Sequence, residues 1–334
     1  MGDEALKAKL RAMRGNLLNR TDYVALSRLS SVGGVGASLR EYAGYAEPLE
    51  LISGAELRRT PLERRLIYSV IDDYFSLYKF ITDYKIRGFM ENFFIKYEIR
   101  IIQSLLGYIF DEREKDFDAE ELSRETKLSL GVKLSQLLKA KTVPELISGL
   151  AGTAYYPVLA RVYHRDVSLF TLDTQLDLYY YRNLWSAVNK FPDKIEKKAL
   201  RHIAGTELDL KNLMWAYRFK RYSLETPQVY ACLVPAGYRI RMPELKRIVE
   251  SDTETPARNY KNVFDNQTAT ENSYLSKMAE TMNRLLRDES VYTARIFAYL
   301  FLKEIEVYNL TSLIEGVRYE LPPKEILSYL CLPA

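Results

Sequence analysis

The chain has 334 residues, enough for about two domains at ~150 residues each, and 48 basic against 44 acidic residues give a formal net charge of +4. Two cysteines and two histidines exclude a disulfide framework and a cysteine-based zinc cluster, and they leave little for a His-rich metal site or a catalytic triad. The near balance of charge does not favour nucleic-acid binding, and 15 glycines with 12 prolines are few enough to favour long helices.

The first residues and the apolar runs bear on location. Residues 1–4 (MGDE) are acidic, unlike the start of a secretory signal. The longest nearly apolar run, residues 101–110, is shorter than the ~20 apolar residues that span a bilayer. These features predict a soluble, cytoplasmic protein.

Apolar residues recur at helical steps of three and four along most of the chain. The glycine-rich segment at residues 33–36 lacks the spacing of a phosphate loop, so we expect a turn or a helix start there. Residues 60–63 (TPLE) and 142–145 (TVPE) have the pattern of capping boxes that start helices. Helical spacing is clearest over residues 67–81, 89–108 and 296–314. No segment alternates strictly, so the sequence predicts an all-α fold.

Two segments predict connections between helical units. Residues 111–121 are rich in acidic side chains, and residues 226–243 contain three prolines and a glycine. Residues 251–272 are polar and predict a long loop. The expected division is into three helical-bundle repeat units at residues 1–115, 116–225 and 226–334.

The three units show weak internal similarity. Residues 207–213 (ELDLKNL) resemble residues 304–310 (EIEVYNL) at a shift of 97, and a shift of 111 relates the first unit to the second. These shifts predict that Glu98, Asp209 and Glu306 occupy equivalent positions. A period near one hundred is too long for common helical arrays, so each unit should hold several helices.

Several segments in this order resemble a known family: residues 9–18 (KLRAMRGNLL), 153–159 (TAYYPVL), 207–213, 304–310 and 315–319 (EGVRY). Together they are similar to the central-stalk subunit of V-type and archaeal A-type rotary ATPases, called the C subunit in prokaryotes and the d subunit in eukaryotes. The chain departs from the pattern at Ile101, where the other two copies have asparagine, and at Glu315, which replaces the basic residue seen at Arg218.

The resemblance implies a pseudo-threefold funnel of three helical units. One end would sit on the membrane rotor ring and the other would receive the rotor subunits of the central stalk. On this reading the protein is not an enzyme and holds no cofactor. It is a monomer in isolation, is cytoplasmic and peripheral to the membrane through the complex, and couples ATP turnover to proton or sodium transport without binding nucleic acid.

The repeated segments supply the candidate interface residues. These are Glu207, Asp209, Asn212, Arg218, Arg221, Glu304, Glu306, Asn309 and Arg318. The two asparagines lie where a helix interior is expected, so they either lock helix packing by hydrogen bonds or contact the stalk. The four acids indicate a solvated or interface face, because no histidine, metal motif or nucleophile accompanies them, and we expect no catalytic, cofactor-binding or metal-binding residue.

Two other functions fit the composition. A helical-repeat scaffold could bind another protein or RNA, although such scaffolds use shorter units in an open stack. A helical hydrolase could hide a carboxylate site among the acids. RNA gel shifts and a hydrolase screen separate these alternatives from a coupling subunit.

Overall fold

The computed structural model describes residues 2–50, 59–112, 134–165, 167–221, 225–251 and 271–332. Within these ranges every regular element is an α-helix and no strand occurs, so the all-α prediction is confirmed. Two expected connections, at residues 113–121 and 252–270, lie outside the described residues, as do the side chains of Arg218 and Arg221.

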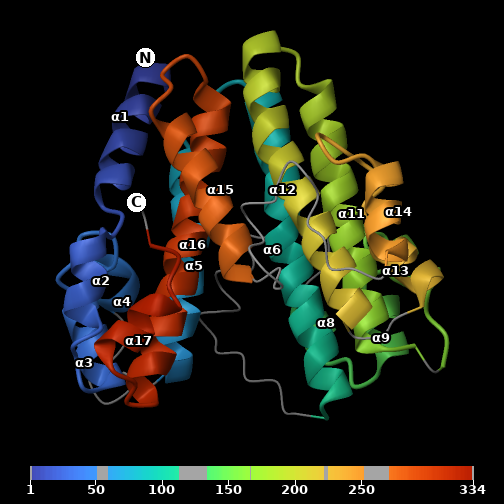
Figure 1. Ribbon diagram of the computed structural model, residues 1–334, viewed down its shortest axis with the longest axis horizontal. Helices are drawn as coiled ribbons and strands as arrows, with labels where there is room; N and C mark the ends of the chain where they lie inside the picture. The colour runs from blue at the N-terminus through green and yellow to red at the C-terminus, as the bar shows by residue number, and fades with distance from the viewer. Residues whose placement is uncertain are drawn as a thin grey trace.

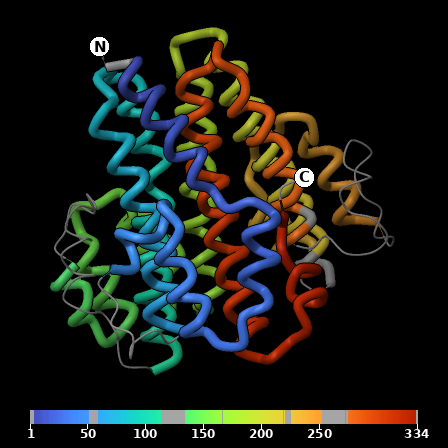
Figure 2. The backbone as a smooth tube through the Cα atoms, turned by 90° about the vertical axis from the view of Figure 1, so that its left-hand side faces the viewer, coloured from blue at the N-terminus to red at the C-terminus, as the bar shows by residue number. Residues whose placement is uncertain are grey.

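The six longest helices of the described residues form three consecutive hairpins. They are α5 (Arg59–Tyr78) with α6 (Tyr84–Phe110), α11 (Leu169–Lys190) with α12 (Lys194–Arg221), and α15 (Glu271–Leu286) with α16 (Tyr292–Arg318). The second helices of the hairpins have nearly the same length, 27, 28 and 27 residues. All three run in the same direction, so the hairpin turns at residues 79–83, 191–193 and 287–291 lie at one end of the molecule, the turn end (Figures 1 and 2).

The hairpins pack against one another in a cyclic order. α6 contacts α11 of the next hairpin, and α12 contacts α15 of the one after that. α16 then contacts α5, which brings the end of the chain back against its beginning. Figure 1 shows α5 and α16 together on the left and α6, α11 and α12 on the right.

Burial explains why these helices form. α16 is apolar around most of its circumference, and 20 of its residues are buried, which is typical of a helix in the centre of a protein. Thr142 caps α9 (Val143–Gly149), as predicted, because its side chain accepts from the Glu145 amide at 3.4 Å. Thr60 instead lies within α5. The glycine-rich segment at residues 33–36 starts a helix, one of the two expected alternatives.

Shorter helices gather in three groups at the sides and the far end of the long ones. The groups are α1 (Gly2–Gly15), α2 (Arg20–Leu26), α3 (Val32–Leu39), α4 (Ala46–Glu50) and α17 (Pro323–Ser328); α8 (Leu134–Leu137), α9 and α10 (Tyr156–Ala160); and α13 (Thr226–Cys232) with α14 (Met242–Glu250). The first group packs on α5 and α16, the second on α6 and α11, and the third on α12.

The proline-containing segment 226–243 is a packed part of the fold. Pro227 and Pro243 lie in the first turns of α13 and α14, where a proline costs no hydrogen bond. Between these helices Val234 and Ile240 are fully buried. Two of the three prolines therefore start helices, and the segment is not an open connection.

No helix among the described residues combines the length and the apolar character needed to cross a membrane.

Candidate functional site

Three acids in the middles of the long second helices hold the short-helix groups in place. Glu98 of α6 accepts from the Tyr155 hydroxyl at the start of α10. Asp209 of α12 accepts the backbone N–H groups of residues 238, 239 and 240 at 3.0, 2.7 and 3.2 Å. Glu306 of α16 accepts from the Tyr45 hydroxyl at 2.5 Å. These acids are the three for which the sequence predicts equivalent positions.

Glu306 also belongs to a buried ion pair. The ammonium group of Lys303 lies 2.8 Å from Oε1 of Glu306 and 3.7 Å from the centre of the Tyr45 ring. The backbone N–H of Leu18 donates to the other oxygen at 2.5 Å. Lys303 interrupts the apolar stripe of its helix in the sequence, and this pairing is the physical reason that it can be buried.

The two candidate asparagines make the same contact in two places. The side chain of Asn212 donates to the carbonyl oxygen of Val234 at 3.1 Å and accepts from its N–H at 2.9 Å. Asn309 does the same with Cys331, at 2.9 and 2.7 Å. In both cases the clasped residue follows 22 positions later in the chain. Of the two roles considered for these residues, the contacts show the packing role.

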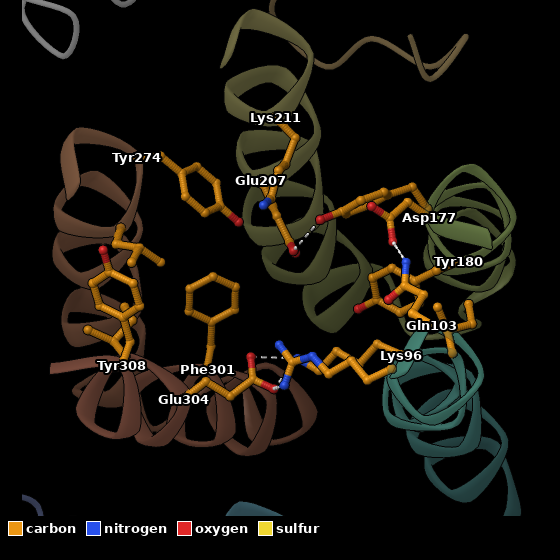
Figure 3. Close-up of a pocket in the computed structure, with 15 residues that line it drawn as sticks. Lys96, Gln103, Asp177, Tyr180, Glu207, Lys211, Tyr274, Phe301, Glu304 and Tyr308 are labelled. Atoms are coloured by element: carbon orange, nitrogen blue, oxygen red, sulfur yellow. Dashed lines mark hydrogen bonds and ion pairs between the residues drawn. The ribbon is translucent and has the colours of Figure 1, made fainter. Parts of the chain in front are cut away.

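A polar cavity of about 290 Å³ lies between the long helices. Its walls come from α6, α11, α12, α15 and α16, and Figure 3 shows their side chains pointing into a common space. The helices bring together charged groups far apart in the chain: Lys96, Arg100, Asp177, Glu207, Lys211 and Glu304. We regard this central cavity as the candidate functional site.

Lys96, Glu207 and Glu304 each precede one of the three anchoring acids by two residues, so all three lie at the same level of the cavity. The ammonium of Lys96 is 2.7 Å from Glu304, and the Tyr97 hydroxyl also donates to that carboxylate. Burial opposes ionisation of Glu304, but the charges of Lys96 and Arg100 outweigh it and hold its pKa below the usual range.

Glu207 is in a different electrostatic state. Its carboxylate is buried and has one long hydrogen bond, from the Tyr181 hydroxyl at 3.4 Å. Burial raises the pKa of Glu207, and the attraction of Lys96 and Lys211 compensates only in part. Two carboxylates at the same level of one cavity thus have pKa values shifted in opposite directions.

The nine predicted interface residues lie in different environments. Asp209, Asn212, Glu306 and Asn309 are buried against the chain itself, and Glu207 and Glu304 line the cavity. Arg318 is at the surface, with its side chain 40% exposed and paired to Glu315 at 2.9 Å. Arg218 and Arg221 belong to the last turn of α12. A fully buried side chain cannot meet a partner without rearrangement, so a contact role for the buried four stays a prediction that burial disfavours.

Sequence reasoning missed the basic and aromatic side of the cavity. Lys96, Arg100, Tyr180 and Tyr274 line it, and none was a candidate. The sequence could have indicated Lys96, because the internal repeat aligns it with Glu207 of the second unit and Glu304 of the third. The tyrosines come from the first helices of the hairpins, where the repeat is weaker.

The fold and this cavity define an all-α protein whose long parallel helices enclose a charged central space. The family model of the ATP synthase (C/AC39) subunit matches residues 6–329. The chain therefore belongs to the ATP synthase (C/AC39) subunit family.

Curated relatives share low but extended similarity. The C subunit of the A-type ATP synthase of Methanosphaera stadtmanae is 28% identical over 251 residues, which are 73% of this chain and 61% of that protein. The same-named proteins of Methanobrevibacter smithii and Methanosarcina acetivorans are 25% and 24% identical over 93% and 94% of this chain, and 83% and 88% of their own lengths. The chain thus spans less than two thirds of the first relative and most of the other two.

Proposed function

We propose that this chain is a non-catalytic coupling subunit of a V/A-type rotary ATPase, linking the rotating central stalk to the membrane rotor ring. Family membership supports this role, as does the similarity to C subunits of A-type ATP synthases. As such a subunit it would be cytoplasmic, monomeric before assembly and peripheral to the membrane, and the coupled ion would be a proton or sodium.

The cyclic packing of the three hairpins is the observation that carries this proposal. A part that transmits torque must resist twisting, and hairpins packed in a cyclic order resist it better than an open stack. The contact of α16 with α5 brings the third hairpin back onto the first, and Glu306 supports this ring by holding Tyr45 and Leu18 from the beginning of the chain. We propose that this ring is the pseudo-threefold funnel, with repeat units near residues 1–115, 116–225 and 226–334.

The two ends of the long helices suit different partners. At the turn end, two large apolar side chains are exposed, Tyr84 by 77% and Ile195 by 61%, at the first turns of α6 and α12. Exposed apolar side chains of this size are typical of protein contact surfaces. We propose that the turn end faces the rotor ring and that the opposite end, with Arg218, Arg221 and Arg318, receives the stalk.

Reconstitution tests the role directly. The catalytic head with its stalk and the rotor ring in vesicles are combined with and without this chain, and ATP hydrolysis and ion uptake are measured separately. We expect ATP-driven uptake only when the chain is present, while hydrolysis by the head continues without it. Uptake of equal rate after omission of the chain, or ATP hydrolysis by the chain alone, would contradict the proposal. Replacing sodium in the buffer identifies the ion.

A further inference from the structure

Among the residues that the structure describes, two buried polar groups facing the central cavity have no hydrogen-bond partner. They are Oε2 of Glu207 and the hydroxyl of Tyr180, and both residues are only 5% exposed. Buried polar groups in native proteins are almost always paired, because an unpaired one loses its hydration without compensation. These two groups in the same small space can each form a new hydrogen bond with a ligand that enters the cavity.

The other charged groups of the cavity already have neighbours. Glu304 forms an ion pair with Lys96 at 2.7 Å, and Asp177 accepts a hydrogen bond from the side-chain amide of Gln103 at 3.0 Å. The ammonium of Lys211 is one helical turn from Glu207 on α12, yet it lies over the Tyr274 ring at 4.7 Å from its centre. Glu207 is therefore the carboxylate with capacity for a new donor.

The cavity has room for a long side chain, since its volume is about 290 Å³. A whole helix, about 10 Å across with its side chains, needs more room than this volume provides. Tyr180, Tyr181 and Tyr274 supply aromatic walls around Glu207. A planar guanidinium stacks on aromatic rings, is weakly hydrated and donates several hydrogen bonds in a fixed fork, so it can reach a carboxylate and a hydroxyl together.

We infer that the central cavity binds one arginine side chain of the stalk partner, with its guanidinium between the Glu207 carboxylate and the Tyr180 hydroxyl. The identity of the partner rests on the proposed function. In this proposal the central cavity lies between α6, α12 and α16 and recognises the partner's arginine. Arg218, Arg221 and Arg318 of this chain, at the end opposite the turn end, belong to the wider contact with the stalk.

Binding of the guanidinium should release a proton. The charged and titratable groups that face Glu207 across the cavity are Lys96 and Arg100 of α6, Asp177, Tyr180 and Tyr181 of α11, Lys211 of α12, Tyr274 of α15, and Glu304 and Tyr308 of α16. Three bases and two carboxylic acids are among them, and the charges balance only when Glu207 is ionised, so a cation gains no long-range attraction. Burial raises the pKa of Glu207, and a cation binds its ionised form, so affinity should rise as the pH rises through that pKa.

Methylguanidinium chloride titrated into the full chain tests the chemistry. Ring signals of ¹³C-labelled tyrosine, assigned with Tyr180→Phe and Tyr181→Phe, should shift saturably. Glu207→Gln should weaken binding at least about tenfold and remove its pH dependence, and Tyr180→Phe should weaken it about threefold. The matched control is Asp177→Asn, which removes a carboxylate from the same cavity. It should change the affinity by less than about twofold, because the side-chain amide of Gln103 already donates a hydrogen bond to the Asp177 carboxylate.

Three results would overturn the inference. The first is unchanged methylguanidinium binding by Glu207→Gln, and the second is an equal loss of affinity in Asp177→Asn. The third is tighter binding of butylammonium than of methylguanidinium, which would indicate a lysine of the partner in place of an arginine. Circular dichroism confirms that each variant is folded.

A second measurement separates this inference from the proposed function. The affinity of the full chain for purified stalk should fall about tenfold in Glu207→Gln and stay unchanged in Asp177→Asn. Stalk binding that is insensitive to Glu207→Gln overturns the inference and leaves the proposed function standing. Failure of the unaltered chain to bind stalk, with Glu207-dependent methylguanidinium binding intact, overturns the proposed function and the assigned partner.

Discussion

Buried side chains with hydrogen bonds to distant backbone are the characteristic residues of this protein. Asp209 is 0% exposed and satisfies three consecutive N–H groups of a segment without regular structure. Glu196 of α12 accepts the first N–H groups of α16 from Thr293 and Ala294, at 2.7 and 3.1 Å, and so caps a helix of another hairpin. Each such bond satisfies backbone that neither helix nor sheet could satisfy.

The two asparagine clasps give a prediction at this scale. Asn212→Ala leaves the buried N–H of Val234 without its acceptor, while the Val234 carbonyl still accepts from the N–H of Ala236 at 2.8 Å. Asn309→Ala removes the hydrogen bonds to the N–H and the carbonyl of Cys331. Each change should lower the free energy of unfolding by about 1–3 kcal/mol. The clasps share no partner, so the double variant should show nearly the sum. Urea unfolding measures all three.

Asn92→Ala is the matched control, because the Asn92 amide donates to Gly88 of its own helix at 2.7 Å. It should change stability by less than ~0.5 kcal/mol. Losses in the clasp variants no larger than in this control would show that the clasps do not stabilise the fold.

At the scale of the helices, close approach decides where short elements attach. α12 meets the segment between α13 and α14 at Gly205, where a Cβ atom would lie 2.4 Å from Cγ of Tyr238. Asp209, one turn along, holds the backbone of Tyr238 at 3.0 Å. Tyr238 therefore cannot move away easily, so the packing requires a glycine at position 205.

Gly205→Ala should consequently destabilise the protein by about 1–3 kcal/mol through overpacking. Gly88→Ala is the control within α6, since its Cβ would meet no atom within 4 Å. A helix-interior alanine there should raise stability by about 0.5–1 kcal/mol. Thermal melting of both variants decides the matter, and a neutral Gly205→Ala would mean that Tyr238 moves aside freely.

For the whole molecule, the residues that hold the hairpins together are different from the residues that a partner can contact. The contacts that bring α16 back to the beginning of the chain are buried, as with Glu306, whose side chain is 4% exposed and accepts from Tyr45 and Leu18. The ion pair of Arg318 with Glu315 is at the surface, and such pairs add about 0–1 kcal/mol. Surface charge can therefore be changed without loss of the fold.

Charge reversal of Arg218, Arg221 and Arg318 together to glutamate should weaken stalk assembly and leave helical content and melting temperature nearly unchanged. The effect should shrink at high salt, because salt screens the attraction between charged groups of two partners. Binding to immobilised stalk and circular dichroism provide the two readouts. Unfolding of the variant would make these residues structural, and normal assembly would place the stalk contact elsewhere.

The control reverses the same number of charges at the other end of α12, with Lys194, Lys198 and Arg201 changed to glutamate. All three are exposed near the turn end. Stalk binding should survive in this variant, because its charges lie at the end assigned to the rotor ring. An equal loss in both variants would point to net charge alone.

Local patterns in the sequence determine the helices of this protein. Apolar spacing, caps such as Thr142 and the scarcity of glycine and proline act within a few residues, so they predict an all-α chain with long helices. The repeated ELDLKNL and EIEVYNL segments likewise predict the corresponding asparagines of α12 and α16, and the structure places them in identical clasps.

Only the tertiary structure decides which polar residues are buried and which pair. Glu306 resembles a solvated acid in the sequence, yet Tyr45, 261 residues away, and Leu18 bring it the donors that make burial possible. The central cavity has the same origin, because Lys96, Tyr180, Glu207 and Glu304 come from four helices and meet only when the hairpins close. Helical periodicity indicates which face of a helix is apolar. Whether a charged side chain on that face can be buried depends on partners from segments that are distant in the sequence.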